Sequence, residues 1–182
     1  MGKTFFSVLL GFVLAFPLAA QTGQQAPIKD LPSWLRNSYA TNRKYLSRTA
    51  DKMPENLYAM RPGAQTEVRT FGQLIGHLAN EHYMICSGVK GEKNPQESVD
   101  YEKKTAKADL VKALQESNAY CDAVYGSLTD TPKLTQSATP GRSDTPFGSL
   151  LMNVTHDSEH YGNIITYLRM KGLVPPSSQP TR

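Results

Sequence analysis

Four long stretches of this sequence repeat apolar side chains at the three- and four-residue spacing of an amphipathic α-helix, and this pattern constrains the fold most strongly. The stretches lie within residues 30–53, 70–87, 110–128 and 145–171. No stretch of any length alternates apolar and polar residues, as a half-buried strand would. The sequence therefore predicts an all-α fold, in which four helices bury their apolar faces against one another as a helix bundle.

Start and stop signals bound these helices. Asp30 is a predicted N-cap, and Pro54 stops the first helix. Thr70 and Gln73 have the spacing of a capping box at the start of the second helix. Thr145, followed by proline, is the predicted N-cap of the fourth helix.

The connections between the helices are long and rich in proline and glycine. They are expected to be long loops, and the last of them, residues 129–144, is rich in turn signals. The two earlier connections, residues 54–69 and 88–104, are expected to supply the walls of any binding pocket.

Residues 1–20 have the pattern of a secretory signal peptide. Lys3 supplies a positive charge, residues 5–16 are almost continuously apolar, and small residues precede Gln21. The apolar run is shorter than the ~20 residues of a membrane-spanning helix, so cleavage is favoured over a membrane anchor. We expect an exported protein, periplasmic or secreted, with no stable membrane anchor after cleavage. A flexible lead-in (21–30), one bundle domain (31–176) and a loose tail (177–182) would follow.

The length and charge of the chain limit the remaining possibilities. A chain of 182 residues suits one domain with a substantial core. The net charge of +4 falls to +3 when Lys3 is removed with the signal peptide. The basic residues are scattered and form no dense patch, so nucleic acid is not an expected partner.

Cys86 and Cys121 are the only cysteines of the chain. Export would permit a disulfide, and an even number of cysteines fits one. Two buried free thiols fit equally well, because both residues lie on apolar faces of predicted helices. The sequence leaves both alternatives open.

The chain has four histidines, two of them four residues apart on the fourth helix. Side chains at this spacing project from one helix face about 6 Å apart, so His156 and His160 could reach one metal ion. A third ligand must come from another helix, and His77 lies at the edge of the buried face of the second helix. His82 is turned about 140° from His77 and is expected to be structural.

The three candidate metal ligands also have alternative roles. His77 could be a core imidazole hydrogen-bonded to a carboxylate, and His156 and His160 could be solvated side chains on a polar face.

Three carboxylates lie close to these histidines in the sequence. Glu81 follows His77 by one helical turn and is our first candidate for a catalytic base or for a residue that supports the ligands. Its alternative role is that of a solvated helix carboxylate. Asp157 and Glu159 point to neighbouring faces of the fourth helix, and either could orient a ligand imidazole.

Two segments resemble the DinB/YfiT-like family. The segment Thr70-Phe71-Gly72-Gln73-Leu74-Ile75-Gly76-His77-Leu78 is similar to the family's second helix. The segment His156-x-x-x-His160-Tyr161-Gly162-Asn163-Ile164-Ile165, followed by Leu168-Arg169 and Gly172-Leu173-Val174-Pro175-Pro176, is similar to its last helix. Together with the helix order, the resemblance covers residues 31–176. Asn163 stands where relatives often have glutamine, a departure that affects only the periphery of the site.

The resemblance implies a four-helix bundle with long crossover connections. It also implies a divalent metal ion held by His77, His156 and His160. Three neutral imidazoles leave coordination positions open, as in a catalytic site, and they accept Zn, Ni, Fe, Mn or Co.

These features predict an exported metal-dependent hydrolase or transferase that acts on a small molecule. Characterised relatives include thiol transferases, and relatives are often dimers, so a homodimer is also expected. The alternative is a non-catalytic binding or interaction bundle that the metal ion only stabilises.

Overall fold

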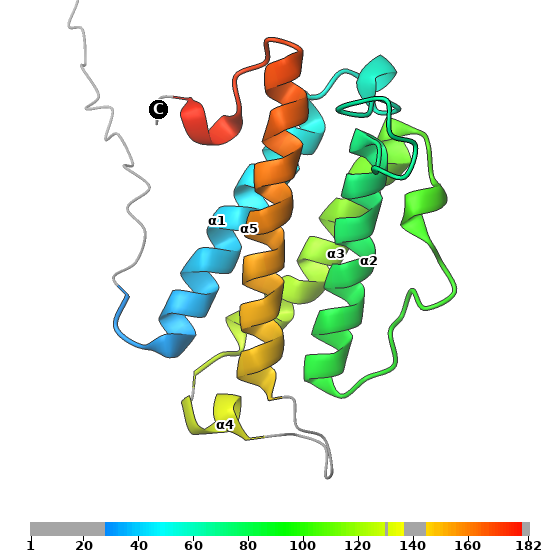
Figure 1. Ribbon diagram of the computed structural model, residues 1–182. Helices are drawn as coiled ribbons and strands as arrows, with labels where there is room; N and C mark the ends of the chain where they lie inside the picture. Colours follow the sequence, from blue (N-terminus) through cyan, green and yellow to red (C-terminus); the bar gives the residue numbers. More distant parts are fainter. Residues whose placement is uncertain (1–27, 130, 137–144, 180–182) are drawn as a thin grey trace, which may run out of the picture.

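The computed structural model describes residues 28–129, 131–136 and 145–179, and every regular element within them is helical. Four long helices lie side by side (Figure 1): α1 (Leu31–Lys52), α2 (Phe71–Lys90), α3 (Lys107–Gly126) and α5 (Pro146–Met170). Helix α1 contacts α3 and α5, and α2 also contacts α3 and α5, so the four helices close into a bundle. The predicted all-α bundle is confirmed.

Four short elements lie outside the long helices: η1 (Glu55–Leu57), η2 (Tyr101–Lys103), α4 (Thr131–Thr135) and η3 (Pro176–Ser178). Helix α4 corrects the prediction that residues 129–144 form only a loop. A five-residue helix is too short to show an apolar period, so the sequence pattern does not reveal it.

The direction of the helices explains one of the long connections, the one between α2 and α3. Helices α1 and α5 run one way along the bundle, and α2 and α3 run the other way (Figure 1). The chain between α2 and α3 must therefore return along the whole bundle, and residues 91–106, which include η2, form this crossover.

Three predicted N-caps are present. The side chains of Asp30, Thr70 and Thr145 each accept a hydrogen bond from a backbone N–H in the first turn of their helix. Gln73 completes the capping box of α2, because its Oε1 accepts from the Thr70 backbone N–H at 2.8 Å. Helix α2 continues to Lys90, beyond its predicted end, and stops where Gly91 adopts a left-handed conformation with φ of 68°.

The predicted signal peptide and most of the predicted lead-in fall in residues 1–27, outside the described residues. Among the helices that the structure describes, none combines the length and the apolar character needed to cross a membrane.

The core consists of two apolar clusters. One cluster contains Leu46, Ala50, Met53, Tyr58, Phe71, Leu74, Ile75, Leu78, Leu110, Leu114, Ile164, Tyr167 and Leu168. The other contains Leu35, Tyr39, Cys86, Cys121, Val124, Tyr125, Leu128, Leu134, Leu150 and Val154. Between the two clusters every long helix carries a buried polar residue, and we call this set the polar layer: Asn42, His82, Ser117, Asn118 and Asp157.

A disulfide joins Cys86 of α2 to Cys121 of α3, with 5.5 Å between the two Cα atoms. This separation is typical of a disulfide. The structure thus decides between the two alternatives that the sequence left open.

Gly76 allows the crossover to pack closely against α2. A Cβ atom at this position would lie 2.4 Å from the carbonyl oxygen of Tyr101, which is backbone of η2 and cannot turn aside. Because Gly76 has no side chain, η2 reaches the helix and brings Glu102 beside His77.

We expect Gly76→Ala to lower the free energy of unfolding by about 1–3 kcal/mol, because the added methyl group must displace the backbone of η2. Gly162→Ala in α5 is the matched control, since a Cβ atom there meets nothing within 4 Å. Alanine in an open helical position should instead stabilise by about 0.5–1 kcal/mol. Urea denaturation of both variants measures the difference, and equal effects would contradict the close approach of η2.

Candidate metal centre

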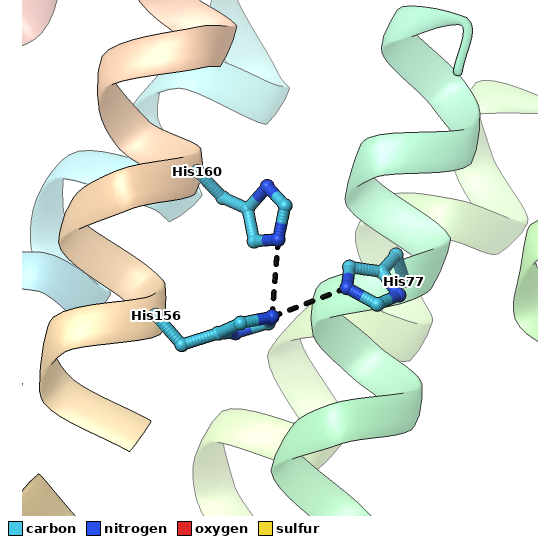
Figure 2. A group of neighbouring side chains, drawn as sticks. All are labelled: His77, His156 and His160. Atoms are coloured by element: carbon cyan, nitrogen blue, oxygen red, sulfur yellow. Dashed lines mark hydrogen bonds between the residues drawn. The ribbon is translucent and has the colours of Figure 1, made fainter. Parts of the chain in front are cut away.

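Three histidines from two helices converge on one point. His77 extends from α2, and His156 and His160 extend from successive turns of α5 (Figure 2). The Nε2 atom of His156 lies 3.2 Å from Nε2 of His77 and 3.0 Å from Nε2 of His160. One ring nitrogen of each residue lies within 4.8 Å of those of the other two. The structure therefore brings together the three histidines that the sequence selected.

These separations fit a metal ion. Nitrogen ligands at about 2.0–2.1 Å from a tetrahedral ion are about 3.3 Å apart, close to the two separations measured from Nε2 of His156. His77 is largely buried, His156 is half-buried and His160 is 8% exposed, so the ligand atoms are partly shielded from water. The donor set of three imidazoles suits a borderline divalent cation such as Zn²⁺.

The surroundings keep two of the imidazoles unprotonated at neutral pH. Burial, together with the neighbouring His77, lowers the pKa of His156. Burial also lowers the pKa of His160, to about 4, and His156 and His77 add to the effect. A neutral ring keeps a lone pair for a metal ion, which protonation would remove.

A carboxylate from the crossover orients His77. Glu102 Oε1 lies 3.0 Å from Nδ1 of His77, and because a carboxylate accepts, the ring nitrogen donates. The neutral ring then presents the lone pair of Nε2 to the other two histidines. Arg69 holds the same carboxylate through two hydrogen bonds, from Nε at 2.8 Å and from Nη2 at 3.2 Å.

Sequence reasoning did not identify Glu102 and Arg69. Both lie in the long connections, where no helical period relates them to the histidines. Their pairing depends on where the crossover passes α2, which only the folded chain shows.

The expectation that Asp157 orients a ligand imidazole is wrong. Its Oδ1 instead accepts from Nε2 of His82, at 2.8 Å in the core, so the orienting carboxylate is Glu102. His82 is fully buried and lies in the polar layer, apart from the three converging rings. Glu159, the other carboxylate expected to orient a ligand, is exposed on α5.

Glu81 is half-buried on α2, one turn after His77. Its charge partly offsets the lowering of the pKa of His156.

A cavity of about 460 Å³ opens beside His160. It lies between α5, the start of α2 and the end of the connection that precedes α2. Its lining residues are Pro62, Glu67, Val68, Arg69, Leu74, Glu159, His160, Asn163, Thr166 and Tyr167. One of the two connections expected to form pocket walls, residues 54–69, therefore lines this cavity.

Comparisons with known families and solved structures give the family and the fold of this chain. A sequence model of the DinB superfamily matches residues 38–164, which include all three converging histidines. The chain belongs to the DinB superfamily. The fold of this DinB superfamily member is similar to the crystal structure of a DinB-like protein from Bacillus cereus ATCC 10987, with a TM-score of 0.63 and 17% sequence identity. The similarity covers 78% of this chain and 93% of the other. No curated protein matches the sequence significantly.

Proposed function

We propose that this protein binds one divalent metal ion through His77, His156 and His160, and that it is an exported hydrolase or transferase that acts on a small molecule. The observation that supports the proposal most strongly is the convergence of the three Nε2 atoms, 3.0 and 3.2 Å apart, from two helices. Three imidazoles that face one point in a partly buried site are unfavourable without a shared cation or proton.

An open coordination position is the reason for proposing catalysis. Closed structural zinc sites usually have four protein ligands, whereas three leave room for water or substrate. A bound ion would lower the pKa of a bound water or thiol and polarise a substrate oxygen. The cavity beside His160 is large enough for a small molecule. Glu81 is the proposed base because it is half-buried one turn from His77.

Export is supported by two features. The apolar run in residues 5–16 has the pattern of a signal peptide. A disulfide between Cys86 and Cys121 is typical of proteins in oxidising compartments. Both features would suit a periplasmic or secreted enzyme.

The alternative function is a non-catalytic bundle that the ion stabilises. It is favoured by the origin of the ligands, because one comes from α2 and two from α5, and an ion would clamp these helices together. Chelation separates the two functions. A structural ion would lower the melting temperature markedly on removal, whereas removal of a catalytic ion would abolish activity with little change in melting temperature.

Metal content tests the proposal directly. The exported protein should be purified without added metal, analysed for Zn, Ni, Fe, Mn and Co, then stripped and titrated with each ion by calorimetry. We expect one ion per chain, whichever metal the site selects. Absence of specific binding of all five ions would refute the proposal.

The orientation of His77 gives a further prediction. Glu102→Gln weakens the acceptor for Nδ1 of His77 and the ion pair with Arg69, so we expect metal affinity to fall about 10- to 100-fold. Glu97→Gln in the same crossover is the matched control, because Glu97 is exposed and pairs only with Lys93 among the described residues. Calorimetric titration of both variants measures the effect. Equal affinities would show that Glu102 does not support the site.

A further inference from the structure

The polar layer contains a second side-chain hydrogen bond between α2 and α5, besides the contact between His77 and His156. His82 of α2 donates from Nε2 to Oδ1 of Asp157 of α5, at 2.8 Å. Both side chains are 0% exposed. Ser117 Oγ of α3 lies 3.4 Å from Nδ1 of the same imidazole. Both ring nitrogens of His82 therefore have a buried partner, one on α5 and one on α3.

His156 and His160, the two converging histidines on α5, lack such support. Of the three, only His77 has a carboxylate of the described residues at its Nδ1. The Nδ1 atoms of His156 and His160 are buried and have no hydrogen-bond partner within the described residues. The direction of these two rings therefore depends on how α5 itself is rotated about its axis.

The buried hydrogen bond between His82 and Asp157 depends on the same rotation. Asp157 directly follows His156, and neighbouring side chains on a helix point about 100° apart. When Asp157 points inward to His82, His156 must point to the side of α5 on which His77 lies. A rotation that turned His156 away would also break the inner hydrogen bond. That rotation is opposed, because a buried polar group that loses its partner cannot turn to water instead.

We propose that the His82–Asp157 pair is a positioning device that fixes the rotation of α5 against α2 and so holds His156 and His160 facing His77. His82 and Asp157 do not touch the ion; they act through the helix that carries two of its ligands. This inference rests on the proposed metal site and extends it.

The decisive variant replaces both partners with apolar residues, His82→Leu/Asp157→Leu. Exchanging a buried polar pair for apolar side chains often preserves stability, but it removes the directional bond. We expect the metal-free variant to keep its helical content while its affinity for Co²⁺ falls about 10- to 100-fold and the visible absorption of bound Co²⁺ changes. A folded double variant with the wild-type Co²⁺ affinity and spectrum would overturn the proposal.

A second pair of variants decides the question if the double variant does not fold. Asp157→Asn retains an oxygen that can accept from His82, whereas Asp157→Ser is too short to reach it. We expect Asp157→Asn to bind Co²⁺ within about threefold of the wild type and Asp157→Ser to bind at least about tenfold more weakly. Wild-type affinity in Asp157→Ser, or a tenfold loss in Asp157→Asn, would contradict positioning by this bond.

The wild-type protein separates this inference from the proposed function. If wild-type protein binds Co²⁺ and the variants bind equally well, only the positioning role fails. If wild-type protein binds neither Co²⁺ nor any of the other four ions, both proposals fail together; if it binds only another of the five, the variants are compared with that ion.

Discussion

Replacing both His156 and His160 with alanine is expected to lower the affinity for a divalent ion by at least about 10³-fold. Each imidazole of a three-ligand site contributes several kcal/mol to binding, and the loss of two leaves only His77. Neither ring belongs to the two apolar clusters, so the metal-free variant should melt within a few degrees of the metal-free wild type. Calorimetric titration and thermal unfolding measure both quantities.

The control for this variant is Thr155→Ala on the same helix. Thr155 is exposed, and within the described parts of the chain its hydroxyl donates only to carbonyl oxygens of its own helix. This control should bind metal as the wild type does. If the double histidine variant also bound metal with unchanged affinity, the ion would be held elsewhere and the proposed site would be wrong.

Removing the disulfide is expected to have the largest effect on stability. Cys86 and Cys121 are separated by 35 residues, and cross-linking a loop of this size lowers the entropy of the unfolded chain by an amount worth about 4 kcal/mol. Replacing both with alanine should therefore lower the free energy of unfolding by roughly this amount and the melting temperature by roughly 10 °C.

Reduction of the wild-type protein controls for the lost side-chain atoms, because both thiols remain in place. The single variant Cys86→Ala should have about the same free energy of unfolding as the double variant, since each of the two variants lacks the cross-link. Unfolding curves of oxidised and reduced wild type that superimpose would show that the disulfide does not stabilise this fold.

The helices could be predicted well because their signals are local. The caps at Asp30, Thr70 and Thr145 depend on atoms within three residues, and the structure contains all three. The long helices were visible because an apolar stripe repeats over many turns. Helix α4 was missed because five residues are too few to repeat anything.

The candidate site could be predicted only in part. The spacing of His156 and His160 places both on one face of a helix, which is a local property. The choice of His77 needed an assumption about which faces of two helices meet, and the resemblance to a family supplied it. The role of Glu102 could not be predicted, because it depends on the path of a long crossover past Gly76.

The error at Asp157 has a similar cause. The sequence places Asp157 next to a ligand histidine, and proximity along the chain suggested that it orients a ligand. In the folded chain its side chain points into the core, about 100° round α5 from His156, where it meets His82. The direction of a side chain between two helices depends on the packing of both, so the sequence pattern of one helix does not determine its partner.

Anomalous X-ray diffraction from crystals of the metal-loaded protein, recorded at the absorption edge of the bound metal, shows whether the three histidines bind one ion. We expect one anomalous peak per chain, about 2.0–2.2 Å from the Nε2 atoms of His77, His156 and His160. A peak at any other place, or three rings that remain within hydrogen-bonding distance with no peak between them, would contradict this expectation.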